Sequence, residues 1–144
     1  MKTVDARTGV ERLERGECLR LLAGDEVGRL AVNDWHTPVI FPVNYRLDGE
    51  AIVFRTDPGT KLSRGPWAPA SFEIDTFDRE RRSGWSVVVV GRLEEVTPYD
   101  AATLERVHAL PVDPWAGGDK AHWIRVVPTR ITGRRVGDAK PHRD

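Results

Sequence analysis

The segment FRTDPGTKL, residues 54–62, holds the densest group of polar side chains that could bind an anion. Arg55 and Lys61 would supply charged hydrogen-bond donors, and Thr56 and Thr60 would supply hydroxyl groups. The Pro-Gly turn between them lets the backbone approach a ligand closely, and turn amides can point into the same concavity. Each charged hydrogen bond contributes about 1.5–3 kcal/mol. The segment indicates a phosphate site, although an ordinary strand–turn–helix corner with solvated charges fits the same residues.

A second candidate group, Pro42, Val43 and Asn44, lies in an apolar stretch typical of a strand. Proline has no amide hydrogen for a sheet ladder, so Pro42 marks an edge, a bulge or a ligand-facing position. Asn44 and nearby backbone groups could then face a planar ring with hydrogen-bonding edges. An edge strand with core aromatic neighbours would give the same pattern.

Two of the five tryptophans fit a ligand site. Trp85, followed by Ser86, starts the most β-branched stretch of the chain, and Trp123 lies near its C-terminal end. A large ring with one polar edge suits an aromatic ligand or a partner subunit. Packing at the ends of a barrel is the alternative, and we prefer it for Trp35 and Trp67.

Motifs for other kinds of chemistry are missing from the sequence. The four histidines are scattered and have no metal-ligand spacing. No serine sits in a nucleophile-elbow context, and no GxGxxG or Walker-type loop is present. Cys18 fits a core position better than a catalytic one. The basic turn 79–82 is interleaved with acids and fits a solvated face, or a dock for the phosphates of a second cofactor.

The composition limits the class of protein. Lys+Arg and Asp+Glu balance at 22 each in 144 residues, which argues against a nucleic acid or an anionic membrane surface as partner. One cysteine permits no internal disulfide, which is consistent with a reducing compartment. Neither a secretory signal nor a membrane-spanning run is evident. We expect a cytoplasmic protein with one folded domain over residues 13–136, a flexible N-terminus over 1–12 and a flexible tail over 137–144.

The elements that must position these residues are mostly strands. The Asp48-Gly49 pair predicts a hairpin between two of them. A short helix is expected after Leu13, and Pro98 should open a second helix. The strands expected are 27–33, 38–47, 50–56, 68–77, 85–96, 122–127 and 130–136. Six or seven short strands with two marginal helices predict an antiparallel barrel.

Four segments together resemble the pyridoxamine 5′-phosphate oxidase-like family of flavin-binding split β-barrels. They read VGRLAV, PVIFPVNYRLDGEAIVFRTDPGTKL, ASFEID and GWSVVVVGRLEEV. The closer similarity is to a small bacterial branch, which includes nitroimidazole-resistance-type proteins and actinobacterial flavin and deazaflavin oxidoreductases. The resemblance implies a mainly β fold, a six-stranded antiparallel FMN-binding split barrel. It also implies a homodimer that holds two FMN molecules in clefts between the subunits.

The resemblance implies three groups of site residues. The FMN phosphate would be held by Arg55, Thr56, Thr60 and Lys61. The isoalloxazine ring would be lined or approached by Pro42, Val43, Asn44, Phe54, Trp85 and Ser86. The partner chain would contribute Trp123 and Arg125.

The function that follows is an FMN-dependent oxidoreductase, in which the flavin exchanges a hydride with a small planar acceptor such as a quinone or nitroaromatic. No acid or base from the protein is required, which fits the missing triad. Vitamin B6 oxidation is not expected, because the chain is much shorter than the oxidase that names the family and lacks its substrate-phosphate residues. The alternatives are a flavin carrier or sensor without turnover, a deazaflavin-dependent reductase and, less favoured, a haem-handling protein.

Overall fold

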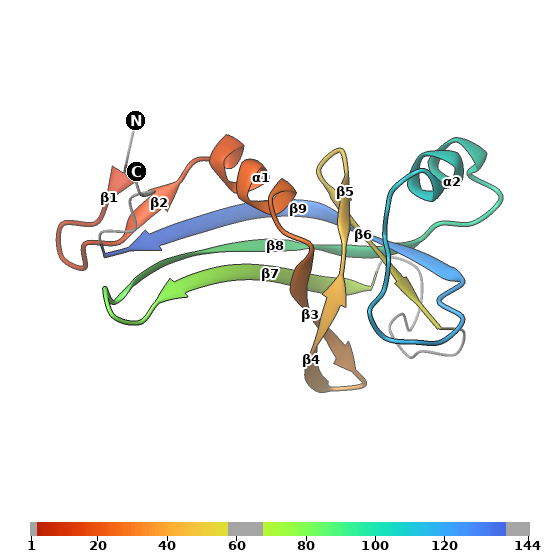
Figure 1. The fold of residues 1–144 in the computed structure, drawn as a ribbon, viewed down its shortest axis with the longest axis horizontal. Helices are drawn as coiled ribbons and strands as arrows, with labels where there is room; N and C mark the ends of the chain where they lie inside the picture. Colours follow the sequence, from red (N-terminus) through yellow and green to blue (C-terminus); the bar gives the residue numbers. More distant parts are fainter. Residues whose placement is uncertain (1–2, 58–67, 138–144) are drawn as a thin grey trace.

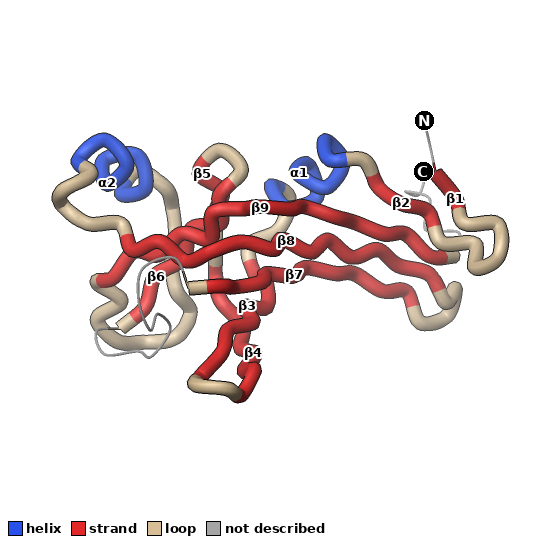
Figure 2. The backbone as a smooth tube through the Cα atoms, turned by 180° about the vertical axis from the view of Figure 1, so that it is seen from behind, coloured by secondary structure: helices blue, strands red, loops and turns tan. Residues whose placement is uncertain are grey.

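The computed structural model describes residues 3–57 and 68–137. Within them the chain forms two helices and nine strands. Figures 1 and 2 show their arrangement from opposite sides. In chain order the elements are β1 (Thr3–Val4), β2 (Glu11–Leu13), α1 (Arg15–Ala23), β3 (Val27–Asp34), β4 (Thr37–Asn44), β5 (Arg46–Asp48), β6 (Ala51–Thr56), β7 (Pro69–Asp78), β8 (Ser83–Glu95), α2 (Ala101–His108) and β9 (His122–Val136).

The strands form one antiparallel sheet that curls into an incompletely closed barrel. Its order is β1-β2-β9-β8-β7-β3-β4, and β6 joins the other side of β9 and carries β5. The short strand β5 pairs only with Ala51–Val53 of β6. The second half of β6 and the strand β4 are therefore not paired to each other. The expected mainly β, six-stranded antiparallel split barrel is confirmed in β3, β4, β6, β7, β8 and β9, to which β1, β2 and β5 are short additions.

Strands β7, β8 and β9 run on past the barrel as a long ribbon (Figure 1). The sequence predicted two C-terminal strands separated at Pro128, but β9 is one strand of 15 residues. A bulge explains the difference: Val90 pairs with Arg130 and Gly91 pairs with Pro128, so Thr129 is the extra residue. The Thr129 hydroxyl donates to the Val90 carbonyl at 3.0 Å. The bulge tolerates the proline and bends the ribbon.

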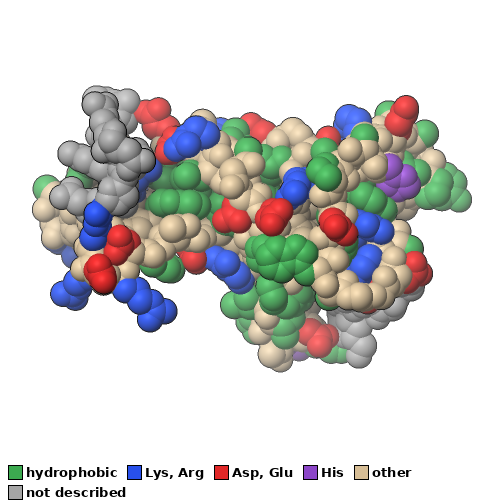
Figure 3. Space-filling view, in the orientation of Figure 1, with side chains coloured by type: hydrophobic (Ala, Val, Ile, Leu, Met, Phe, Trp, Pro, Cys, Tyr) green, Lys and Arg blue, Asp and Glu red, His purple; other side chains and the backbone are tan. Residues whose placement is uncertain are grey.

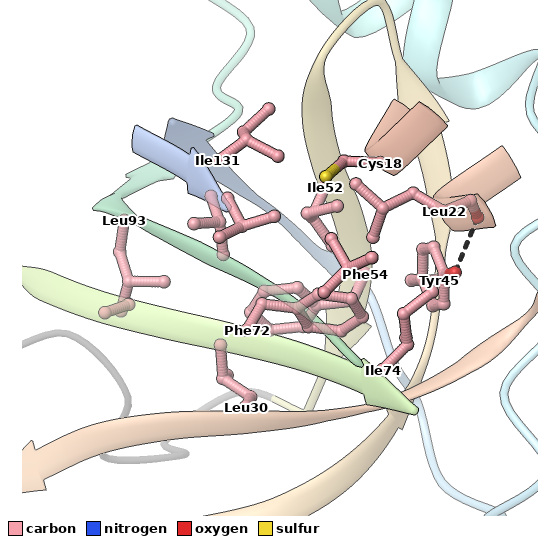
Figure 4. Close-up of a cluster of buried hydrophobic side chains, with 14 of the residues drawn as sticks. Cys18, Leu22, Leu30, Tyr45, Ile52, Phe54, Phe72, Ile74, Leu93 and Ile131 are labelled. Carbon is pink, nitrogen blue, oxygen red and sulfur yellow. Dashed lines mark hydrogen bonds between the residues drawn. The ribbon is translucent and has the colours of Figure 1, made fainter. Parts of the chain in front are cut away.

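The main core fills the inside of the barrel (Figure 4). Phe54 and Phe72 are fully buried there, and Cys18 of α1 packs into the same cluster, as the sequence indicated. The Tyr45 hydroxyl donates to the Leu22 carbonyl of α1 at 2.6 Å. Burial raises the pKa of Tyr45 above its ordinary value, so the phenol stays a neutral donor. This bond fixes α1 over one end of the barrel.

Helix α2 covers a second, smaller cluster on the outer side of β6 and β9. Val53, Val107 and Val112 are buried in it, and Trp123 packs against it. The helix begins at Ala101 and not at Pro98, because Asp100 caps it by accepting the Thr103 amide at 3.1 Å. The loop that follows α2 leads back across the barrel to β9.

The predicted hairpin at Asp48-Gly49 is confirmed as the β5–β6 turn. Gly49 adopts φ +61°, a conformation that favours glycine. The turn brings β6 back beside β4, which sets up the unpaired opening between them.

Candidate functional site

A cavity of about 200 Å³ lies in the opening between β4 and the second half of β6. Three segments that are distant in sequence line it: two strands and the loop between α2 and β9. The lining residues are Phe41, Pro42, Val43 and Asn44 of β4, Arg55 and Thr56 of β6, and Pro114, Ala116 and Lys120 of the loop. Pro42, Val43, Asn44, Arg55 and Thr56, which the sequence had singled out in two separate segments, thus share one cavity.

The β4 side of the cavity is the edge of a sheet. Within the described residues β4 pairs only with β3, so alternate backbone N–H and C=O groups face the opening without a strand partner. Pro42 interrupts the row of donors. Such an edge suits a flat heterocycle whose rim alternates hydrogen-bond donors and acceptors.

The loop over residues 109–121, here called the bridging loop, closes the cavity from outside. On the β4 side, the Trp115 amide donates to the Asn44 side-chain oxygen Oδ1 at 2.9 Å. On the β6 side, Arg55 donates from Nε to the Lys120 carbonyl at 3.0 Å and from Nη1 to the Val112 carbonyl at 3.1 Å. The loop is therefore fixed to both edges of the split.

Asp57, which follows β6, forms a third attachment of the bridging loop to the barrel. Its carboxylate accepts the Lys120 amide at 2.9 Å and the Lys120 ammonium at 2.6 Å. The hydrogen bond from the Lys120 side chain is the main reason that the pKa of Asp57 is lowered. Gly118 adopts φ +120°, and a Cβ at this position would lie 2.7 Å from Asp57 Oδ1. Only glycine fits this turn without displacing the carboxylate.

Asp57, Trp115 and Lys120 were not predicted from the sequence as site residues. Lys120 ends a Gly-Gly-Asp-Lys run, which marks a loop with special backbone angles but does not indicate what the loop covers. The partners are 63 to 71 residues apart, so no local pattern joins them.

Arg55 supports the loop, where the sequence had suggested contact with phosphate. Beyond its two bonds to loop carbonyls, its guanidinium lies 4.9 Å from the centre of the Trp123 ring. No acidic side chain among the described residues pairs with it. Its positive charge therefore remains beside the cavity while its position is fixed by the loop.

The predictions for three further residues of the phosphate and ring sites have different outcomes. Thr60 and Lys61 lie outside the described residues. Phe54 does not line the cavity: it is fully buried and faces Phe72 inside the barrel (Figure 4). It can only support the cavity wall from behind.

Trp85 and Ser86 lie at the other end of the molecule from the cavity. They begin β8 and pair with Arg135 and Arg134 near the end of β9, whereas Glu95 at the end of β8 pairs with Ile124, next to Trp123. Ten residues of strand separate the two ends, roughly 30 Å. Within one chain these two residues cannot contact a ligand in the cavity. The basic turn 79–82 lies beyond them, at the same far end.

The expectation that Trp123 and Arg125 reach a site in a partner chain stays a prediction, and within their own chain both residues have partners. The Trp123 ring lies between Arg55 and His108, whose ring centre is 5.0 Å away. Arg125 is mostly buried, 3.7 Å from Asp48 and 3.8 Å from Glu94. Trp123 thus backs the residue that anchors the bridging loop.

Other kinds of site find no support in the part of the chain that the structure describes. Over residues 3–57 and 68–137 no group of three His, Cys, Asp or Glu side chains could hold a metal ion. Neither α1 nor α2 is long and apolar enough to span a membrane.

The family model for pyridoxamine 5′-phosphate oxidase matches residues 14–135, nearly the whole described fold. The chain belongs to the pyridoxamine 5′-phosphate oxidase family. An uncharacterized protein from Mycobacterium tuberculosis is 33% identical to this chain over 138 residues, which cover 91% of this chain and 88% of that protein.

Two solved structures are similar to this member of the oxidase family over most of both chains. The FAD-binding protein from Mycobacterium smegmatis is 37% identical with a TM-score of 0.73, covering 88% of this chain and 97% of that chain. An FAD-binding protein from Mesorhizobium loti is 29% identical with a TM-score of 0.73, covering 89% and 99%. The resemblance inferred from the four sequence segments is confirmed at the level of family and fold.

Proposed function

We propose that this protein binds a flavin nucleotide in the split between β4 and β6 and uses it to reduce a small planar acceptor of the quinone or nitroaromatic type. The observation that carries the proposal is the cavity itself. It joins the edge of β4, the charge of Arg55 and the Thr56 side chain under one fixed loop. Because the chain belongs to a family of flavin-binding proteins, we propose a flavin as the ligand of this cavity.

The form of the flavin is also part of the proposal. The sequence favoured FMN, but the two solved structures compared above are FAD-binding proteins, so FAD takes the first place and FMN the second. Thr56, Thr60 and Lys61 remain the proposed phosphate contacts. Arg55 contributes through its charge and through the loop that it anchors. Within one chain the basic turn 79–82 lies far from the cavity, so deazaflavin takes the third place.

The chain's own residues would orient the ring and control its surroundings. A bound flavin supplies the hydride chemistry. The free edge of β4 would hold the ring's hydrogen-bonding rim, and the bridging loop would exclude water from one side. The positive charge of Arg55 would favour an anionic group in the cavity. No acidic or basic side chain needs to transfer a proton.

A homodimer is the proposed assembly. A cavity of about 200 Å³ is smaller than the roughly 300–1,000 Å³ typical of ligand pockets, so one chain would cover only part of a flavin. The outer face of the sheet carries a row of apolar or small side chains, Ile40, Ala31, Ser71 and Val90, that register places side by side. Ile40 is 70% exposed, and Figure 3 shows hydrophobic side chains gathered over the β3–β4 hairpin.

A second copy that covers this face would bury the row in an isologous contact. Trp85 and Ser86 would then belong to the site as the partner's contribution, because they cannot reach the cavity of their own chain. In this arrangement the partner chain contributes Trp85, whereas the sequence had suggested that it contributes Trp123.

Titration of the purified protein with FAD, FMN and riboflavin tests flavin binding, followed by changes in flavin absorbance and fluorescence. Stopped-flow mixing of the photoreduced complex with menadione or a nitroaromatic then tests turnover. A rate that saturates with acceptor and exceeds that of free flavin supports an oxidoreductase. A rate that is linear in acceptor and no faster than that of free flavin indicates a carrier. Failure to bind any of the three flavins would overturn the proposal.

A further inference from the structure

Trp115 is a large aromatic side chain held at the rim of the cavity with its ring in solvent. It is 73% exposed, which is unusual for tryptophan, whose apolar surface normally finds cover. Its two neighbours in the chain, Pro114 and Ala116, both line the cavity. The residue therefore lies where a ligand too large for the cavity would emerge.

The backbone of Trp115 is fixed, which separates it from an ordinary loop-tip residue. Its amide donates to Asn44 on one side of the split, and Arg55 and Asp57 hold Lys120 on the other side. Fixing the backbone on both sides limits the positions that the ring can take. An aromatic ring on a fixed backbone binds a planar partner at a lower entropic cost than a ring on a mobile loop.

The remaining exposed aromatic residues do not share this position. Trp35 lies in the β3–β4 turn, Phe77 near the far end of the ribbon, and Tyr99 in the segment before α2. None of them neighbours a residue that lines the cavity. Among the described residues Trp115 is thus the exposed aromatic ring placed to meet a group that extends out of the split.

We propose that Trp115 stacks on the adenine of FAD and makes the site prefer FAD to FMN. This rests on the proposed function, since it requires that the isoalloxazine occupies the cavity. The size of the cavity, about 200 Å³, leaves the adenosine half of FAD outside it. Adenine has a flat π-face and no charge, which matches an exposed indole. The diphosphate would pass beside Arg55, which has no acidic partner among the described residues.

The test compares dissociation constants for FAD, FMN and riboflavin in the wild type and in Trp115→Ala. Base–aromatic stacking implies that the dissociation constant for FAD rises roughly five- to a hundredfold. FMN and riboflavin, which lack adenine, should bind as before. Trp115→Phe, which keeps a flat ring, should restore most of the FAD affinity. Tyr99→Ala removes a fully exposed aromatic ring away from the cavity and serves as the matched control.

ADP provides a probe that is independent of the flavin ring. The wild type should bind ADP weakly and Trp115→Ala should not. If Trp115→Ala weakens FAD and FMN by the same factor, the residue only shapes the loop, and the inference is overturned. An unchanged FAD affinity overturns it as well. A wild type that binds none of the three flavins refutes the proposed function instead, so the two failures are distinguishable.

Discussion

Replacing Arg55 with alanine separates two roles that sequence and structure assign to the same residue. The sequence suggested a phosphate contact, whereas the guanidinium is bonded to the Lys120 and Val112 carbonyls of the bridging loop. Hydrogen bonds to a charged group contribute about 1.5–3 kcal/mol each, and partial exposure favours the low end. The contact with Trp123 adds about 0.5–1 kcal/mol. The Arg55→Ala variant should therefore lower the local free energy of opening the loop by about 4 kcal/mol.

Hydrogen exchange of the loop amides measures this loss directly. Protection of residues 112–120 should fall, while protection of the barrel strands should not. Affinity for all three flavins should fall, because the cavity loses a wall that FAD, FMN and riboflavin all contact. FAD and FMN should lose somewhat more than riboflavin, because their phosphates also lose the favourable charge of Arg55. Lys61→Ala provides the contrast: it should weaken FAD and FMN about tenfold to more than a hundredfold and leave riboflavin unchanged.

Arg46→Ala is a matched control for the Arg55 variant. Arg46 also donates to a backbone carbonyl, that of Tyr45 at 3.1 Å, and is partly buried, but it does not line the cavity. Its loss should leave loop protection and flavin affinity unchanged. If Arg55→Ala instead weakens FAD and FMN but spares riboflavin, with the loop amides still protected, Arg55 is a phosphate ligand and the anchoring account fails.

Three further predictions concern the bridging loop, the Asp48–Arg106 ion pair and the assembly. Gly118→Ala should loosen the loop in hydrogen exchange without lowering the melting temperature much, because φ +120° and the 2.7 Å approach to Asp57 leave no room for a Cβ; normal loop protection would contradict this. The pKa of Asp48 is lowered chiefly by its hydrogen bond from Arg106. The Asp48–Arg106 pair therefore stabilises the fold at pH values above the unfolded-state pKa of Asp48, and this stabilisation is lost as the pH falls through the folded-state pKa. Asp48→Asn should cost about 1–3 kcal/mol in urea unfolding at neutral pH and flatten the acid dependence below about pH 4; an unchanged acid profile would count against it. Analytical ultracentrifugation should find a dimer, which Ile40→Glu weakens; a stable wild-type monomer at micromolar concentration would refute the assembly.

The fold was predictable because the patterns that locate strands and turns involve residues close together in the sequence. Alternating apolar residues located the strands, and Asp48-Gly49 located a hairpin whose glycine needs a positive φ. The misplaced boundaries have physical causes. Pro128 was interpreted as a break, but a bulge at Thr129 absorbs it, and the cap at Asp100 starts α2 three residues after Pro98.

The site was predictable only in part. Pro42, Val43, Asn44, Arg55 and Thr56 meet as expected, because β4 and the second half of β6 flank the opening of the split barrel. The loop that covers them joins Asn44 to Trp115 and Asp57 to Lys120, partners that are distant in sequence. Trp85 and Ser86 show a second limit of prediction from sequence. Their motif resembles the family's flavin site, but sequence does not reveal whether a motif serves its own chain or a neighbour.

A crystal structure of the protein with FAD would show where the flavin binds. We expect electron density for the isoalloxazine between β4 and β6, beneath the bridging loop, with the ring's hydrogen-bonding rim on the free edge of β4. Density for the flavin elsewhere, on the ribbon near Trp85 of the same chain or on the outer side of α2, would contradict it.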